Sequence, residues 1–470
     1  MKKSIAVFVL SIGILCILLY LITHPPTPKI EPIPEGSFSE WMGIYFHGQK
    51  VGYLASYREH TDTGTVYISK TYMEAEPMGK KDTVEVYTKG LADNKGNFQS
   101  VEMIMKSGAH FFRLTAHRED TTIYVKVESG GTEKTATIPC PREAFIPVTV
   151  EALALNAPGK IQKFKLFDPL VGNIIDVEVI PGEKESLDIH SEKYYARRVD
   201  IKMLNTYTSF WIDDENRIVK EHSPIGVDML IEPEEMAKRI EGKVKLYDMF
   251  AVKVGRVEID PRTAQFLKIR ISGIDTKDYP INDSWQTLRG NTLTIKKPAL
   301  PPDTLRIHCP DSLAKDTLPT PFLPSNDSTV LAFLKTIVET QEPTVKNVER
   351  INLWLFKNLT KKPTFSFPNP LDVLKTKEGD CNEHSILFAT FCRSLGIPAR
   401  VVVGLVYVEG GFYYHAWNKV WLGKWIPVDP TFGQFPADPF HMKLEEGDFS
   451  NQARIMGVIG SINIEILEYK

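Results

Sequence analysis

The period of the hydrophobic pattern changes once along this chain, and this change constrains the fold more than any other feature. Between residues 37 and 307, short runs such as WMGIYFHG, VGYLASYRE and GTVYISKTYM alternate apolar and polar residues. Turn sequences such as HGQK, DTGT and DNKG separate the runs, which is typical of antiparallel strands. From residue 329 onward, apolar residues recur three and four positions apart, which predicts helices. The pattern predicts an all-β part followed by a part that contains helices.

These patterns predict several domains, and a chain of 470 residues is long enough to give each its own core. We expect a large antiparallel β-rich domain at residues 37–243, a meander that forms a sandwich or a barrel. A helix at 233–241 should close it. A small β domain is expected at 244–307, and the Pro, Asp and Ser content of 308–328 predicts a linker. Residues 329–470 then form an α+β domain.

The N-terminus has the pattern of a membrane anchor. Two lysines precede an apolar stretch without charges at residues 5–22, long enough to cross a bilayer. No small-residue cleavage pattern follows it, so residues 1–22 are expected to be a cytoplasmic end and an uncleaved transmembrane helix. A cleaved signal peptide and a lipid-modified Cys16 are the alternatives. Residues 23–36 form a Pro-rich tether, and the positive-inside rule places the rest of the chain outside the cytoplasm.

Composition and charge exclude some classes of function. The formal net charge is −3, and no domain is strongly basic, so nucleic acid is not an expected partner. Cys140 and Cys309 lie in the similar contexts IPCP and IHCP, and a disulfide between them stays open because spacing does not determine pairing. No pair of Cys or His residues has zinc-site spacing, so we expect neither a metal nor another cofactor. The sequence leaves the oligomeric state open.

The segment GDCNEHSILFATFCRSLGIPAR, at 379–400, contains a clearly delimited helix. Asp380 and Glu383 are spaced as a capping box, with Asp380 as the N-cap. Gly396 suits the C-terminal end of the helix, and a proline follows. Cys381 is therefore predicted to be the first helical residue.

The position of Cys381 gives it a possible chemical role. At a helix N-terminus, unpaired N–H groups and the helix dipole favour a thiolate, which predicts a lowered cysteine pKa. Cys392 lies about three turns further along the same helix, inside an apolar run, and is expected to be a core residue. A purely structural role for Cys381 is the alternative, because most lone buried cysteines pack without reacting.

The strands predicted after this helix place a histidine close to a carboxylate. His415 lies in FYYHAWNKVWL and Asp429 in WIPVDPT, on adjacent antiparallel strands. A two-residue turn would place Asn418 opposite Asp429 and turn His415 to the other face of the sheet. A three-residue loop at 422–424 pairs Trp417 with Asp429 and brings His415 to the same face. We therefore predict an odd loop or a β-bulge, which completes an arrangement of nucleophile, base and orienting carboxylate.

The motifs GDCNEHSILFATFCRSLGIPARVVVG, HAW and WIPVDPT together resemble the core domain of the transglutaminase-like superfamily, a papain-related fold. The resemblance covers about 329–470 and is strongest at 379–431. It implies that Cys381 is the nucleophile, His415 the base and Asp429 the residue that orients the base. The calcium requirement and glutamine specificity of large animal transglutaminases do not carry over, because their accessory domains have no counterpart here.

The expected activity is acyl transfer from an amide through a thioester. The enzyme would be a peptidase or amidase if water accepts the acyl group, which we favour, and a protein cross-linking acyltransferase if a lysine does. Asn382 is a candidate oxyanion-hole residue, although a surface polar role is the alternative. Trp417 is a candidate for the substrate groove, as are Trp421 and Trp425 less strongly, although packing is the alternative for all three.

Other interpretations stay open. Glu383 and His384 follow Cys381 closely, but Glu383 has a capping role and a lone histidine there is expected to be exposed, so no metal is predicted. The expected substrate is a peptide, a protein or a cell-envelope polymer, reached by a membrane-anchored chain outside the cytoplasm. The alternative function is a non-catalytic cell-envelope binding or assembly protein that uses the β-rich region.

Overall fold

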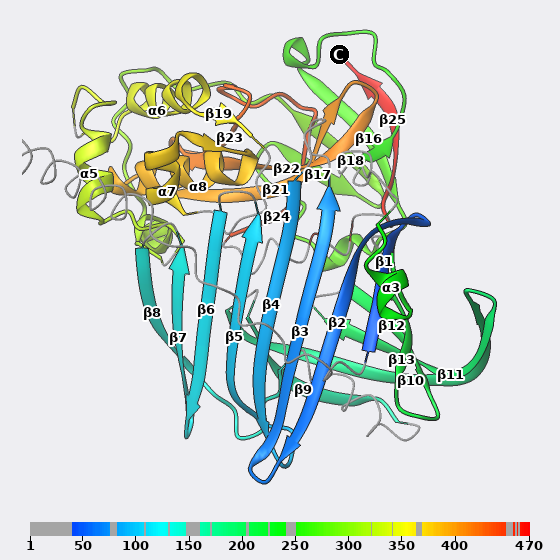
Figure 1. Cartoon of the computed structure of the whole chain (residues 1–470). Coiled ribbons are helices and arrows are strands. Elements are labelled where there is room, and N and C mark those ends of the chain that lie inside the picture. The colour runs from blue at the N-terminus through cyan, green and yellow to red at the C-terminus, as the bar shows by residue number, and fades with distance from the viewer. Residues whose placement is uncertain are drawn as a thin grey trace, which may run out of the picture.

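The computed structural model has a large β-rich part and a smaller α+β part (Figure 1). The structure describes residues 40–75, 82–107, 110–129, 132–146, 160–169, 172–203, 206–223, 226–240, 251–320, 322–340, 342–362, 369–447, 455, 458 and 461–470.

The β-rich part is one antiparallel sheet of fourteen strands in the described residues. Strands β1 to β8 pair in chain order, β9 to β14 do the same, and β1 pairs with β14. The strands are β1 Glu40–Phe46, β2 Gln49–Thr61, β3 Gly64–Ala75, β4 Asp82–Asp93, β5 Phe98–Ser107, β6 His110–Glu119, β7 Thr122–Ser129, β8 Thr132–Pro139, β9 Gln162–Asp168, β10 Asn173–Ile189, β11 Glu192–Met203, β12 Thr206–Asp213, β13 Ile218–Ser223 and β14 Val227–Ile231.

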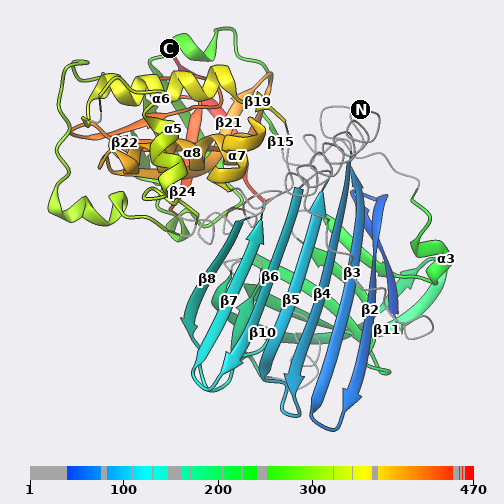
Figure 2. The ribbon, with the colours of Figure 1, turned by 60° about the vertical axis from the view of Figure 1, so that its left-hand side comes forward.

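This sheet folds back on itself, so that β9 to β13 lie behind β2 to β8 (Figures 1 and 2). The two halves share apolar contacts: Phe167 of β9 stacks on Phe98 of β5 with ring centroids 5.1 Å apart. Apolar residues of β9 to β13 form a second cluster with Met42 of β1. The expected large antiparallel β-rich region is therefore confirmed. The helix expected at its end is shorter than predicted, a single turn at Glu234–Ala237 (α3).

In the described residues, the C-terminal part combines helices with two antiparallel sheets and one short parallel pair. The strand orders are β15-β22-β21-β24, with β23 also on β22, and β17-β18-β16-β25, and the parallel pair is β19-β20. The helices are α5 Ser328–Leu334, α6 Val345–Asn358, α7 Pro370–Thr376 and α8 Cys381–Ser394. The strands are β15 Ala251–Lys253, β16 Phe266–Ser272, β17 Gln286–Arg289, β18 Thr292–Lys296, β19 Thr360–Lys361, β20 Glu378–Gly379, β21 Ala399–Val408, β22 Gly411–Trp421, β23 Trp425–Val428, β24 His441–Glu446 and β25 Asn463–Tyr469.

The segment expected as a small β domain at 244–307 shares its core with the rest of the C-terminal part. One apolar cluster runs from Ala264 to Ile464. Strand β25, at the C-terminus, pairs with β16, and β15 pairs with β22. The segment expected as a linker at 308–328 is also packed, since it contains the 3₁₀ helix Asp311–Thr317 (η5) with the buried Asp316.

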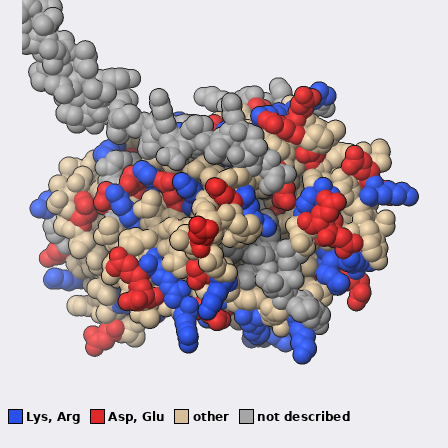
Figure 3. Space-filling model, turned by 60° about the horizontal axis from the view of Figure 1, so that its bottom comes forward, with Lys and Arg blue, Asp and Glu red and all other residues tan. Residues whose placement is uncertain are grey.

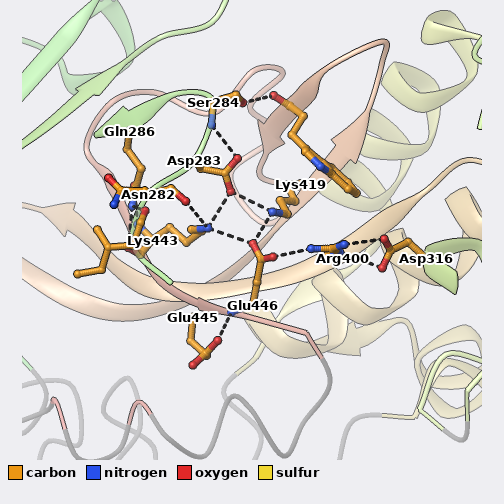
Figure 4. Close-up of polar contacts among 12 residues, drawn as sticks. Asn282, Asp283, Ser284, Gln286, Asp316, Arg400, Lys419, Lys443, Glu445 and Glu446 are labelled. Atoms are coloured by element: carbon orange, nitrogen blue, oxygen red, sulfur yellow. Dashed lines mark hydrogen bonds and ion pairs between the residues drawn. The ribbon is translucent and has the colours of Figure 1, made fainter. Parts of the chain in front are cut away.

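A buried cluster of charged residues fastens these segments to the sheet (Figure 4). Lys419 of β22 and Lys443 of β24 both contact Asp283, at 2.9 and 2.7 Å, and both contact Glu446. Arg400 of β21 joins Glu446 to Asp316, as Figure 4 shows. We call these six residues the ion cluster: Asp283, Asp316, Arg400, Lys419, Lys443 and Glu446. Burial alone would raise the pKa of Glu446, but Lys443 and Lys419 lower it to about 2.

The described residues contain no helix that is both long and apolar enough to cross a membrane. The transmembrane helix expected within residues 1–22 lies outside the described residues. Cys140 is buried and Cys309 exposed, and both are free thiols, so the disulfide left open by the sequence is not formed. Basic and acidic side chains intermingle on the face shown in Figure 3.

Candidate functional site

The N-terminus of α8 has the predicted capping box. The Asp380 side chain accepts the N–H of Asn382 at 2.7 Å, and Glu383 accepts the N–H of Asp380 at 2.9 Å. Gly379 permits this close approach, because a Cβ there would lie 2.3 Å from the Cβ of Glu383. Cys381 is the first residue of the helix, as the sequence predicts. The prediction for Cys392 is also confirmed, since it is fully buried in the core.

The sulfur of Cys381 lies against an open stretch of the edge of β22. Strand β15 pairs with residues 411–413 and β23 with residues 418–421, so these two strands leave 414–417 between them. In this gap, the backbone N–H of Ala416 donates a hydrogen bond to the Cys381 sulfur. Because Ala416 follows His415 directly, the thiol lies next to His415, the residue predicted to be its base.

The thiolate expected at Cys381 is not favoured in this structure, so that prediction is wrong for the conformation described. Burial raises the pKa of the Cys381 thiol well above its usual value, and the nearby Asp380 carboxylate raises it further. The Ala416 hydrogen bond acts in the opposite direction but does not outweigh burial. The helix N-terminus favours the thiolate, but the surrounding protein excludes water and disfavours the charged form more strongly, and this burial cannot be predicted from the local sequence.

The loop between β22 and β23 has the predicted odd length. Trp421 pairs with Trp425, so the loop has the three residues 422–424. The same register, continued past Val428, brings Trp417 opposite Asp429 and His415 to the same face. The register prediction is therefore confirmed.

His415 and Asp429 form a buried pair. Nε2 of His415 lies 2.7 Å from Oδ2 of Asp429, and both side chains are almost fully buried. The imidazole lies between two aromatic rings, with Phe432 at 4.8 Å and Trp417 at 6.0 Å between centroids, both nearly parallel to it. Because Nε2 donates to the carboxylate, Nδ1 is the nitrogen that can accept a proton.

Asp429 accepts hydrogen bonds at both of its oxygens. Oδ1 accepts the N–H groups of Thr431 at 2.7 Å and Phe432 at 3.0 Å, while Oδ2 accepts from His415 and from His441, the latter at 3.0 Å. Burial alone would raise the pKa of Asp429, but His415 and His441 together hold it well below its usual range. The carboxylate is therefore ionised and fixed in orientation.

Residues 332–430 match the family model of the transglutaminase-like superfamily. The C-terminal domain is transglutaminase-like.

The similar proteins cover only part of this chain. Human kyphoscoliosis peptidase is 34% identical over 85 residues, which are 16% of this chain and 13% of that protein. A peptide-N(4)-(N-acetyl-beta-glucosaminyl)asparagine amidase of Arabidopsis thaliana is 28% identical over 87 residues, 18% of this chain and 11% of that protein. The crystal structure of a beta-barrel-like protein of a domain of unknown function from Brucella abortus covers 41% of this chain and 95% of its own, at 14% identity and a TM-score of 0.33.

Two residues at the site of the transglutaminase-like domain, Asp438 and His441, were not predicted from the sequence. Nε2 of His441 lies 3.0 Å from Asp429, and Nδ1 lies 3.0 Å from Asp438. The only local signal is the sequence DPFHM, in which a histidine opens a strand. Burial alone would lower the pKa of His441, but Asp438 and Asp429 raise it to about 10.

Asn382 and Trp417 differ in their surroundings. Oδ1 of Asn382 accepts a hydrogen bond from the Tyr414 hydroxyl at 3.3 Å, which leaves the Nδ2 group of Asn382 to donate elsewhere. Trp417 is fully buried, so in this conformation it packs against His415 and offers no groove surface. Trp421 and Trp425 pack edge to face at 5.7 Å.

The expectation that His384 is exposed is wrong, because it is fully buried. Its Nδ1 lies 2.6 Å from the carbonyl oxygen of Asp380, and burial lowers its pKa, so the ring is neutral. A different group has metal-like proximity in the described residues: ligand atoms of His415, Asp429 and His441 lie within 4.8 Å of one another. Hydrogen bonds from the two histidines to the shared carboxylate account for this proximity.

Proposed function

We propose that this chain is a cysteine enzyme that acts on amide bonds through Cys381, His415 and Asp429 and a thioester acyl-enzyme. The observation that carries the proposal is the hydrogen bond from the N–H of Ala416, the residue after His415, to the Cys381 sulfur, together with the buried pair of His415 and Asp429. The match of residues 332–430 to the transglutaminase-like superfamily supports it.

In the first step, the thiol gives up its proton as it attacks. The sulfur of Cys381 bonds to the amide carbonyl carbon, and its proton passes to Nδ1 of His415. The tetrahedral intermediate then collapses, the C–N bond breaks, and the departing amine takes the proton from His415. Because burial raises the pKa of the thiol, this route starts from a neutral thiol rather than from a preformed ion pair.

The oxyanion of the intermediate would lie at the start of α8. The backbone N–H of Cys381 has no helical partner at that position and can donate to it. The N–H groups of Asn382 and Ala416 are already engaged, by Asp380 and by the Cys381 sulfur. The Nδ2 group of Asn382, held by the contact of Oδ1 with Tyr414, is the second donor we propose.

In the second step, an acceptor attacks the thioester carbon, loses its proton to His415 and releases Cys381, which regains a proton. Water as the acceptor gives a peptidase or an amidase, and a lysine amine gives a cross-linking acyltransferase. We favour water, because transfer to an amine needs a site that excludes water. A peptidase and an amidase are among the relatives, which is in keeping with this choice.

We further propose the location and the substrate class. The apolar stretch within residues 1–22 would anchor the chain in a membrane, with the remainder outside the cytoplasm. The substrate would then be a peptide, a protein or a cell-envelope polymer. Protease accessibility of the chain in intact cells and in lysed cells checks the orientation.

A non-catalytic binding protein is the second candidate, and the raised pKa of the half-buried Cys381 thiol is the observation that favours it. In that case, the β-rich region would bind or assemble envelope components, and Cys381 would only pack. The two candidates differ in whether His415 controls the reactivity of Cys381.

Thiol alkylation separates them. The purified full chain is treated with iodoacetamide between pH 5 and 9, and the labelling rates of Cys381 and the exposed Cys309 are compared by mass spectrometry. We expect His415→Ala to slow Cys381 by about 10²-fold or more, because general-base assistance is lost, while Cys309 keeps its rate. Cys381→Ala identifies the labelled peptide. If the ratio of the Cys381 and Cys309 labelling rates is unchanged in His415→Ala, the non-catalytic binding protein is the better supported hypothesis.

A further inference from the structure

His441 has hydrogen-bond acceptors at both of its ring nitrogens. Nε2 lies 3.0 Å from a carboxylate oxygen of Asp429, and Nδ1 lies 3.0 Å from a carboxylate oxygen of Asp438 and 3.2 Å from the backbone carbonyl oxygen of Asp438. A carboxylate and a carbonyl can only accept, so both nitrogens must carry protons to make these contacts. With these contacts, His441 is an imidazolium that donates hydrogen bonds to both Asp429 and Asp438.

Asp438 is itself held in place. Its Oδ1 accepts the N–H of Phe440 at 2.9 Å, and its Oδ2 accepts from the side-chain amide of Gln434 at 2.8 Å. The backbone N–H of Asp438 returns a hydrogen bond to Gln434 at 2.7 Å. These contacts fix Asp438 in position. Asp438 is the outer end of a hydrogen-bonded series of side chains, Asp438–His441–Asp429–His415.

At the inner end of this series, the Asp429 carboxylate contacts His415. His441 and His415 share Oδ2 of Asp429, while two backbone N–H groups occupy Oδ1. Aromatic rings enclose the two histidines, since Trp417 and Phe432 meet His441 edge-on at 5.4 and 6.2 Å between centroids. No described residue of this group is solvent-exposed, so its hydrogen bonds are not exchanged with bulk water.

We infer that His441, anchored by Asp438, is a positioning residue that holds Asp429 in the orientation in which it directs Nδ1 of His415 toward Cys381. The inference deepens the proposed function and rests on it. His441 does not touch the reacting atoms. It acts through Asp429, as residues behind a reactive group commonly do.

The charge of His441 has a second consequence. Two carboxylates, Asp429 and Asp438, face this site, and His441 offsets one of them. With His415 neutral the four residues carry a net charge of −1, and when His415 takes the thiol proton the net charge becomes zero. The arrangement therefore accommodates the protonated His415 that the first step produces.

The kinetic test compares two substitutions of one residue. Turnover of p-nitrophenyl acetate by the full chain gives kcat and KM for His441→Leu and His441→Gln. We expect His441→Leu to lower kcat by about 10²-fold with little change in KM, because one donor to the orienting carboxylate is lost. Glutamine can still donate from its amide to Asp429, so His441→Gln should recover kcat to within about 10-fold of the wild type.

Lys443→Met is the matched control, since Lys443 lies on the same strand and the same face as His441 but belongs to the ion cluster. Its kcat per folded molecule should equal that of the wild type. Wild-type kcat in His441→Leu, or equal losses in His441→Leu and His441→Gln when both melt as cooperatively as the wild type, would overturn the inference.

An NMR measurement keeps this test separate from the proposed function. In the Cys381→Ala chain with ¹⁵N-labelled histidine, His441 should show two protonated ring nitrogens at pH 8, assigned by their absence from the His441→Gln spectrum. A ring with one protonated nitrogen refutes the inference even in an active enzyme. Two protonated nitrogens together with an inert Cys381 would refute the proposed function while leaving the hydrogen bonds of His441 as described.

Discussion

The two buried polar clusters of the transglutaminase-like domain share one face of the same strands, yet they differ in composition. In the sheet register His415 faces Gly404, which faces Lys443, and Lys419 faces Arg400. Residues that face one another across antiparallel strands lie on one side of the sheet, so the histidines and the ion cluster are neighbours there. Trp417, two residues from both His415 and Lys419 on β22, separates them.

The difference lies in the kinds of charged group that each cluster contains. The ion cluster balances three cations against three anions, and its contacts join segments far apart in the sequence, such as Asp283 with Lys443. The other cluster, which we call the histidine cluster, consists of His415, Asp429, Asp438 and His441 and contains two imidazoles, and all of its members lie between 415 and 441. We infer that the ion cluster holds the domain together, whereas the histidine cluster holds a proton where the proposed reaction needs it.

The largest expected effect comes from breaking the histidine cluster at Asp429. In Asp429→Asn, the amide oxygen can keep the N–H groups of Thr431 and Phe432, but its NH₂ group then faces His415 and His441. His415 must therefore accept at Nε2 and carry its proton on Nδ1, where it cannot act as a base. We expect kcat with p-nitrophenyl acetate to fall by about 10³- to 10⁴-fold.

Circular dichroism of Asp429→Asn provides the control, since its spectrum should match that of the wild type. A fall in kcat of less than 10-fold would show that the orientation of His415 does not limit the reaction. A role in the reaction would then no longer distinguish the histidine cluster from the ion cluster.

Breaking the ion cluster should instead change stability. Lys443→Met leaves Asp283 and Glu446 buried with one cation fewer, and removing one partner of a buried ion pair typically costs about 3–5 kcal/mol. Urea unfolding followed by tryptophan fluorescence measures the loss. The double variant Lys443→Met/Asp283→Asn restores the charge balance and should lose less than the sum of its single variants. Additive losses would mean that the two residues do not interact.

Local sequence patterns predicted much of the site. The capping box of α8, the position of Cys381 and the three-residue loop before β23 depend on neighbours in the chain, and the structure has each of them. The approach of His415 to Asp429 followed from that loop, because the period of a strand transmits register over a few residues.

Contacts that depend on distant segments could not be predicted in this way. His441 reaches Asp429 because β24 joins the sheet beside β21, a pairing that no local pattern specifies. Asp283 lies outside the helices and strands, and Asp316 lies in the segment expected as a linker, although each pairs with a cation of the ion cluster. The raised pKa of Cys381 has the same origin, because burial is a property of the whole fold.

The pH dependence of stability should distinguish the clusters again. The pKa of His441 is raised to about 10 in the folded protein from its ordinary 6.5. Its contribution to stability is therefore complete below about pH 6.5 and is lost as the pH rises through 10, by up to about 1.4 kcal/mol per pH unit. The difference in free energy of unfolding between wild type and His441→Leu should shrink over this range.

Lys443→Met serves as the reference for that experiment, and its difference from the wild type should stay constant between pH 6.5 and 9. A constant difference for His441→Leu as well would show that His441 does not exchange a proton on unfolding in this range.

The smallest expected effect tests whether geometry matters in the ion cluster beyond charge. Arg400 makes two parallel contacts with Asp316, at 2.9 and 2.7 Å, and a third with Glu446 at 2.6 Å. Lysine in Arg400→Lys keeps the charge but has no planar fork to span two carboxylates, so we expect a loss of about 1.5–3 kcal/mol. Arg400→Met also removes the charge and should lose more, approaching Lys443→Met. Equal stability of Arg400→Lys and wild type would show that the cluster needs only its charge balance, whereas the proposed role of the histidine cluster depends on the direction of each hydrogen bond.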